Sequence, residues 1–264
     1  MNQPIPPLVG MVHLRPLPGS PGFKGDFQSV VDDAVADATT LGEAGFPALL
    51  VENFGDAPFF AGRVPPETIA SMTLAVDAVH RKVGLPFGVN VLRNDGIAAV
   101  AIAAITGARF VRVNVLTGVM HTDQGPIVGE AAVLQRRRAQ MSPEVEIWAD
   151  VMVKHATPPP ELDLAQAVAD TVERGLADAI IISGPRTGIG PSPEDLETVR
   201  AAIPKGTRVV VGSGASAENL AVLGQEADTI IVGSSVKTGN DPRNPVDPEK
   251  ARIFVSAAAE HGLL

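Results

Sequence analysis

Short apolar runs alternate with helix-forming segments along the entire chain, and this alternation restricts the fold more than any other feature. Eight runs rich in Val, Ile and Leu are predicted to form β-strands, at residues 8–13, 48–53, 87–91, 110–115, 146–153, 179–183, 208–212 and 229–233. Segments with helical patterns follow them at 27–44, 66–83, 95–106, 130–140, 162–175, 193–202, 216–224 and 247–261. Val- and Ile-rich strands are typical of a parallel sheet that helices cover.

Eight strand–helix units predict an α/β fold, a single (β/α)8 TIM barrel that spans residues 1–264 as one domain. An open doubly wound sheet is the alternative, but eight regular units favour closure of the sheet. Glycines are expected to end four of the helices, at Gly45, Gly84, Gly107 and Gly175.

The composition argues against several classes of protein. The net charge is −9, whereas a nucleic-acid site needs clustered positive charge; the basic run at 136–138 is expected on a solvated helix surface. The chain has no cysteine, which excludes disulfides, thiol nucleophiles and Cys metal sites. No apolar stretch is long enough to span a membrane, and the first residues lack a signal-peptide pattern. We therefore expect a cytoplasmic protein.

Several predicted strands are polar on one face and apolar on the other. Side chains alternate along a strand, so the apolar faces are expected to pack against the helices and the polar faces to line the barrel interior. The polar residues near the C-terminal mouth are His13, Glu52, Asn90, Arg112, Asn114, Asp150 and Lys154. TIM-barrel enzymes perform their chemistry at this mouth. A network of buried ion pairs, for example Arg112 with Glu52 or Asp150, is the structural alternative.

These side chains offer several chemical roles. Lys154 is a candidate for Schiff-base formation or for binding a carboxylate, and either Glu52 or Asp150 is a candidate general base. No cofactor is predicted; a set of Glu, Asp and His side chains could hold a divalent metal, but no HExxH-like spacing supports one. The candidate catalytic residues are Glu52, Asp150, Lys154, Arg112 and His13, and the candidate ligand-binding residues on the strands are Asn90 and Asn114.

Two predicted strands end in nearly the same glycine–serine sequence, V-G-S-G-A-S at 211–216 and V-G-S-S-V-K at 232–237. They are the seventh and eighth strands, whose loops often form a phosphate site in TIM barrels. Glycine lets an anion approach backbone N–H groups, serine adds donors, and a helix that begins near Ser216 would point its positive end there. We predict a phosphate site at Gly212, Ser213, Gly214, Gly233, Ser234 and Ser235, with Lys237 as a candidate charge partner or a solvated residue beyond the turn. Tight turns without a ligand are the alternative.

Two loops are candidates for lids over the barrel. The segment 116–129 is too long for an ordinary strand–helix loop and has glycines that could serve as hinges. The loop after the second strand carries Phe54, Phe59 and Phe60, which could cover a pocket or contact a partner. Contacts between copies of the chain are the alternative role for both loops, and a homo-oligomer is expected.

Motifs in the loops resemble those of the BtpA family. The matching stretches are G-M-V-H-L-R-P-L-P-G-S-P at 10–21, E-N-F-G-D-A-P-F at 52–59, V-P-P-E-T at 64–68, G-V-N-V-L-R-N-D at 88–95, H-T-D-Q-G at 121–125, S-G-P-R-T-G at 183–188, V-G-S-G at 211–214 and N-P-V-D at 244–247. The resemblance implies a barrel of the ribulose-phosphate-binding type, with Thr187 and Gly188 as further ligand-binding candidates. The family takes its name from a peripheral thylakoid protein involved in photosystem I biogenesis, which implies a role in membrane biogenesis.

Two classes of function therefore stay open. The first is an enzyme that acts on a small phosphorylated metabolite, such as a sugar phosphate, with lyase, isomerase or epimerase chemistry. The polar interior and the glycine–serine turns favour this class. The second is a non-catalytic assembly or stabilising factor, peripherally associated with a membrane. A nucleotide-binding protein is less well supported, because no Walker or G-x-G-x-x-G sequence follows a predicted strand.

Overall fold

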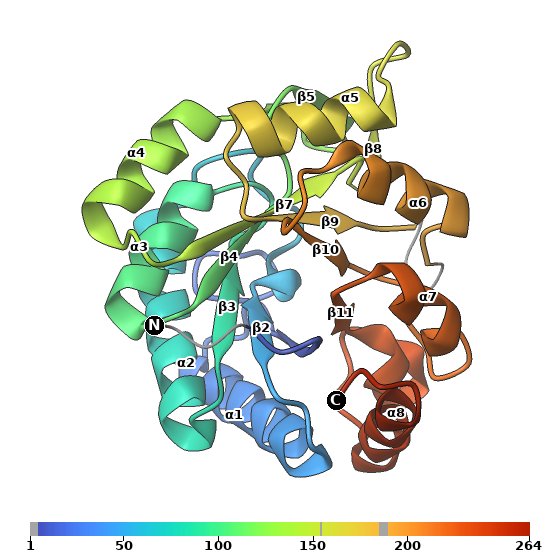
Figure 1. The fold of residues 1–264 in the computed structure, drawn as a ribbon. Helices are drawn as coiled ribbons and strands as arrows, with labels where there is room; N and C mark the ends of the chain where they lie inside the picture. Colours follow the sequence, from blue (N-terminus) through green and yellow to red (C-terminus); the bar gives the residue numbers. More distant parts are fainter. Residues whose placement is uncertain (1–4, 154, 185–189) are drawn as a thin grey trace.

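Eight parallel strands close into a barrel in the computed structural model, which describes residues 5–153, 155–184 and 190–264 (Figure 1). The strands are β1 Leu8–His13, β2 Leu49–Glu52, β3 Phe87–Asn90, β4 Phe110–Val113, β7 Glu146–Val151, β9 Ala179–Ile182, β10 Arg208–Val211 and β11 Thr229–Val232. Their order around the barrel follows the chain, and β11 pairs with β1 to close it. The predicted TIM barrel is confirmed, and the open doubly wound sheet is excluded.

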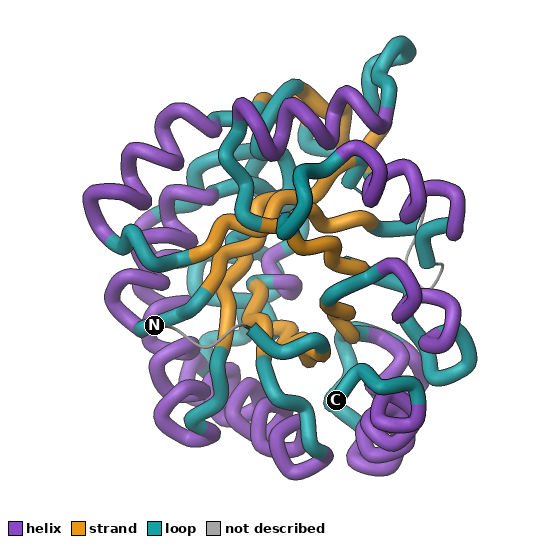
Figure 2. Tube along the Cα trace, in the orientation of Figure 1, coloured by secondary structure: helices purple, strands orange, loops and turns teal. Residues whose placement is uncertain are grey.

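Helices surround the barrel and cover the outer face of the strands (Figure 2). They are α1 Phe27–Ala44, α2 Pro66–Val83, α3 Gly96–Thr106, α4 Ala131–Met141, α5 Leu164–Ala169, α6 Pro193–Ala202, α7 Leu220–Glu226 and α8 Pro248–Glu260. Three of the predicted glycine ends, Gly45, Gly84 and Gly107, adopt the left-handed conformation, in which the absent Cβ removes the steric penalty. Within the described ranges, none of the helices has the length and hydropathy that crossing a bilayer requires.

One predicted helix start is wrong, and the predicted helix end at Gly175 is confirmed without the left-handed conformation. Helix α7 begins at Leu220 rather than near Ser216, because Asn219 caps a turn ahead of it: its Oδ1 accepts from the Ser216 amide at 2.8 Å and its Nδ2 donates to the Gly214 carbonyl at 2.8 Å. After α5 the chain continues as a π-helical turn, Asp170–Arg174, which ends at Gly175 as predicted, although Gly175 has an ordinary φ of −79°. The positive end of a long helix therefore does not point at the first glycine–serine turn.

The barrel interior has an apolar floor and a polar mouth. Near the floor, Phe110 and Trp148 stack with their ring centroids 4.0 Å apart. Gly88 makes room for this pair, because a Cβ at this position would lie 2.3 Å from Cε2 of Phe110. Toward the mouth, Glu52 pairs in register with Asn90, which in turn pairs with Arg112, so three neighbouring strands present polar side chains side by side. The alternation of polar and apolar residues in the sequence thus predicted which faces of these strands line the barrel interior.

The close packing of Phe110 against Gly88 leads to a prediction for the Gly88→Ala variant. We expect the added methyl group to overpack the interior and to lower the free energy of unfolding by about 1–3 kcal/mol. Urea denaturation measures this change. Gly62→Ala is the matched control, because a Cβ at Gly62 meets nothing within 4 Å, and its effect should stay within about 0.5 kcal/mol. Equal effects of the two substitutions would contradict the role of Gly88 as a space for Phe110.

The segment 116–129 has secondary structure of its own. It contains an antiparallel hairpin of β5 Val119–Thr122 and β6 Gly125–Val128, and β5 also pairs with β8 Ala156–Thr157. This small sheet joins the loops that follow β4 and β7. The segment predicted as a long loop therefore forms a β-hairpin, and β8 pairs with this hairpin to make a three-stranded sheet.

Candidate active site

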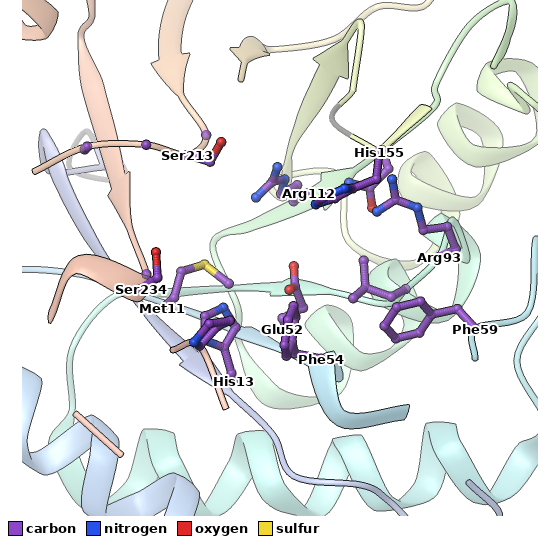
Figure 3. A pocket seen from close by; sticks show the side chains of 17 residues that line it. Met11, His13, Glu52, Phe54, Phe59, Arg93, Arg112, His155, Ser213 and Ser234 are labelled. Carbon is purple, nitrogen blue, oxygen red and sulfur yellow. The ribbon is translucent and has the colours of Figure 1, made fainter. Parts of the chain in front are cut away.

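A cavity of about 140 Å³ opens at the C-terminal ends of the barrel strands (Figure 3). Pockets for drug-sized ligands typically have volumes of about 300–1,000 Å³, so this smaller cavity suits a small metabolite. Its lining combines both glycine–serine turns with charged side chains from the strands. The lining residues are Met11, His13, Glu52, Phe54, Phe59, Leu92, Arg93, Arg112, Asn114, His155, Gly212, Ser213, Gly214, Ala215, Gly233, Ser234 and Pro242.

Arg112 and Asp150 form a buried, bidentate ion pair at the base of this cavity. Arg112 donates through Nε and one terminal nitrogen to the two carboxylate oxygens of Asp150, both at 2.8 Å, and Asn114 donates to the same carboxylate at 3.3 Å. Burial lowers the pKa of Arg112, but Asp150 and Glu52 more than offset this, and the pKa is raised above its ordinary value. The pair corresponds to the ion-pair network that the sequence left open as an alternative. Because both of its oxygens bind Arg112, Asp150 holds the guanidinium in place.

Asn90 supports this pair from the neighbouring strand. Its side-chain amide donates to the Arg112 carbonyl at 3.0 Å and to Oδ1 of Asn114 at 3.2 Å. Neither Asn90 nor Asp150 lines the cavity. The structure thus places these two predicted site residues beneath the cavity floor, whereas Arg112 and Asn114 reach its surface.

Glu52 and His13 lie side by side at the ends of β2 and β1, where they are paired in register. Glu52 is 7% exposed and lies between the two glycine–serine turns and the wall formed by Arg93 and Phe59 (Figure 3). The ring of His13 contacts Phe54, with centroids 4.8 Å apart. Gly233 leaves space for His13, because a Cβ there would lie 3.2 Å from Cε1 of the imidazole. Both residues therefore present polar atoms to the cavity.

The turns that follow β10 and β11 face the same cavity. In the first turn Gly214 has a φ of +80°, a conformation that favours glycine. A Cβ at Gly212 would lie 2.7 Å from Oγ of Ser183 and 3.2 Å from a terminal nitrogen of Arg112, so these three groups converge. The hydroxyls of Ser183 and Ser213 are buried, and neither has a hydrogen-bond partner within the described part of the chain. Donors without protein partners are what an anion site requires.

Several predicted site residues lie elsewhere. Ser235 does not line the cavity, although Ser234 beside it does. Lys237 is 1% exposed and forms an ion pair with Asp37 of α1, whose other carboxylate oxygen accepts from the Val246 amide at 2.7 Å. Burial lowers the pKa of Lys237, and Asp37 opposes this shift. Lys237 is thus neither a charge partner for the turns nor a solvated residue, because it ties α1 to the segment before α8.

Three predicted site residues, Lys154, Thr187 and Gly188, lie outside the described residues. Among the described residues, no group of three or more His, Asp or Glu side chains is placed to hold a metal ion.

The aromatic residues of the loop after β2 lie in different environments. Phe54 and Phe59 line the cavity, whereas Phe60 is 59% exposed.

Sequence reasoning missed two charged or titratable residues of the cavity, Arg93 and His155. Arg93 follows β3 and is 7% exposed. Burial lowers the pKa of Arg93, and the negative charges of Asp150 and Glu52 oppose this decrease. His155 follows β7 and has a φ of +59°, in the left-handed region that non-glycine residues seldom adopt. Both residues lie beyond the strands, where alternation no longer indicates direction. An arginine three residues after the end of a barrel strand is the signal that was available in the sequence.

Comparison with known proteins decides the family. Residues 5–260 match the BtpA family. This chain belongs to the BtpA family. Among its BtpA-family relatives, the Photosystem I biogenesis protein BtpA of Synechocystis is 49% identical over 254 residues, which cover 96% of this chain and 88% of that protein. An uncharacterised protein of Thermococcus kodakarensis is 48% identical, with 96% and 95% of the two chains covered.

Solved structures show the same fold at low sequence identity. KGPDC from Streptococcus mutans has a TM-score of 0.60 and 14% identity to this BtpA-family protein, covering 97% of this chain and 99% of that one. Thiamine phosphate pyrophosphorylase from Pyrococcus furiosus has a TM-score of 0.57 and 16% identity, covering 97% and 96%. At these identities the likeness shows that the barrel is shared.

Proposed function

We propose that this BtpA-family protein is an enzyme that acts on a small phosphorylated metabolite, with lyase, isomerase or epimerase chemistry. The observation that carries the proposal is the convergence of two glycine–serine turns and buried charged side chains on one small cavity. Backbone N–H groups around Gly212–Gly214 and at Gly233–Ser234 bind the phosphate, and the hydroxyls of Ser183 and Ser213 add donors.

The reacting end of the metabolite then lies over Glu52 and Arg112. Glu52 serves as the general base, because Asp150 is held by both of its oxygens in the pair with Arg112. Arg112 stabilises the negative charge that develops on the substrate oxygen when a proton leaves the neighbouring carbon. His13, beside Glu52, is placed to move a second proton. Lys154, which follows β7 in the sequence, is retained as a candidate for carbonyl chemistry.

The solved structures that share the fold are consistent with this proposal. Their titles name a thiamine phosphate pyrophosphorylase, an orotidine 5'-phosphate decarboxylase and an N-(5'-phosphoribosyl)anthranilate isomerase. Each title names a phosphate ester. A barrel with phosphate-type turns after its last two strands is thus a reasonable scaffold for phosphate-ester chemistry.

Inorganic phosphate tests the proposed site directly. We expect titration with phosphate to shift the backbone amide NMR signals of Gly212, Ser213, Gly214, Gly233 and Ser234. Ser234→Asp places a negative charge in the turn and should weaken phosphate binding at least about tenfold, because like charges repel at short range. Ser256→Asp is the matched control, since Ser256 is exposed on α8 and does not line the cavity, and the same charge there should leave the affinity unchanged. Signals that move elsewhere, with these five unaffected, would refute the site.

A non-catalytic assembly factor at a membrane surface is the second candidate function. The observation that favours it is the name of the Synechocystis relative, a photosystem I biogenesis protein. The net charge of −9 opposes electrostatic attraction to anionic lipids, and Arg138 of the basic run pairs with Asp178. Flotation with vesicles of anionic lipid separates the two functions. Stable flotation without any phosphate binding would favour the assembly factor.

A further inference from the structure

Arg93 occupies the wall of the cavity that faces the glycine–serine turns. Figure 3 shows Ser213 and Ser234 on one side, Arg93 and His155 on the other, and Arg112 with Glu52 between them. A ligand that places a phosphate on the turns therefore extends its far end toward Arg93. This geometry makes Arg93 the group that meets the end of the ligand opposite the phosphate.

The backbone around Arg93 is fixed from several directions. Its amide donates to the Phe60 carbonyl at 3.1 Å. The next residue, Asn94, exchanges two hydrogen bonds with the backbone of Val115, at 2.9 and 2.8 Å. Asp95 accepts from the amides of Val64 and Ala98, both at 2.9 Å. A cation on so well anchored a loop is positioned before a ligand arrives, which reduces the entropic cost of binding.

The charges of the cavity also favour an anion at this end. Asp150 neutralises Arg112 from below, and the other acidic and basic side chains in the lining are Arg93 and Glu52, apart from the imidazoles of His13 and His155. Arg93 is 7% exposed, and burial disfavours its charged form. An anionic group of the ligand balances this charge in a buried setting. The planar guanidinium fork suits a carboxylate, which it can bind through two hydrogen bonds.

We propose that the substrate of this site is a phosphorylated carboxylic acid, whose carboxylate binds Arg93 and His155 at the end opposite its phosphate. This inference rests on the proposed function, because it needs the phosphate to bind at the two turns. His155 has a φ of +59°, and such strained conformations concentrate at ligand-binding sites, where the surrounding structure holds them. The imidazole adds an N–H donor beside the guanidinium.

A pair of ligands that differ in one group tests the proposal. Glycerol 3-phosphate and 3-phosphoglycerate both carry a phosphate ester, but only the second has a carboxylate in place of the terminal hydroxymethyl group. Isothermal titration calorimetry should show that 3-phosphoglycerate binds at least about tenfold more tightly, the gain expected for a charge-assisted bidentate contact. Equal affinities would overturn the proposal. Tighter binding of propane-1,3-diol bisphosphate than of 3-phosphoglycerate would assign a second phosphate and overturn the carboxylate.

Variants of Arg93 locate the preference. In Arg93→Met the affinities for the two ligands should converge, while the affinity for glycerol 3-phosphate stays within about threefold of the original value. Arg93→Lys keeps the charge without the fork and should retain part of the preference, which provides a second test if the Met variant does not fold. An unchanged preference in either variant would overturn the role of Arg93. If the unaltered protein binds no phosphate at the turns, this result would instead refute the proposed function.

Discussion

Arg112→Met is expected to lower the free energy of unfolding by about 3–5 kcal/mol, because it leaves the Asp150 carboxylate buried without its partner. The side chains of Arg112 and Asp150 are 4% and 0% exposed, so water contributes almost nothing to this pair in the unaltered protein. Within the described ranges, Asn114 is then the side chain left to donate to this carboxylate, at 3.3 Å. Urea denaturation monitored by circular dichroism measures the change.

The matched control for this variant is Arg81→Met. Arg81 pairs with Asp77 on the surface of α2, and its side chain is 77% exposed. The same substitution there should change stability by less than about 0.5 kcal/mol, because solvent screens a surface ion pair. The double variant Arg112→Met with Asp150→Asn should be more stable than Arg112→Met alone, since it removes the uncompensated charge. A double variant less stable than the single one would contradict this account of the pair.

The barrel could be predicted because each strand carries its own evidence. In β2, Leu50 and Glu52 share a face and Leu49 and Val51 share the other, and the same period of two recurs in β4. Register then brings Glu52, Asn90 and Arg112 together without further information. The position of the two glycine–serine turns follows from their order in the chain, which a closed parallel barrel converts into a place on the rim.

Contacts between distant residues could not be predicted in this way. Asp37 and Lys237 are separated by 200 positions, so nothing near Lys237 in the sequence indicates that its charge is buried against α1. The delayed start of α7 depends on hydrogen bonds between Asn219 and the turn at Gly214, whose geometry the helical pattern does not contain. The direction of Arg93 likewise depends on a loop that Asn94 and Asp95 anchor through the backbones of other elements.

Glu52→Gln is expected to slow proton transfer by this site severely while leaving phosphate binding intact. Glutamine keeps the size and polarity of the side chain but cannot accept a proton, and general base catalysis contributes about 10²–10⁴-fold to a rate. The measurement is deuterium incorporation from heavy water into bound ligands, followed by NMR over a panel of ketose phosphates and phosphorylated 2-keto acids. In the unaltered protein we expect exchange at a carbon next to the carbonyl of at least one ligand.

In Glu52→Gln the exchange rate should fall on the order of 10³-fold, with the affinity for inorganic phosphate within about threefold of the original. Glu43→Gln, at an exposed position on α1, is the matched control and should exchange at the unaltered rate. Exchange that persists in Glu52→Gln would reassign the base, and the Asp150→Asn variant would then separate the two carboxylates. If the unaltered protein exchanges no ligand of the panel, Glu52 does not serve as a base toward carbonyl substrates. The cavity would then bind its phosphate ester without the proton transfer that isomerase and epimerase chemistry require.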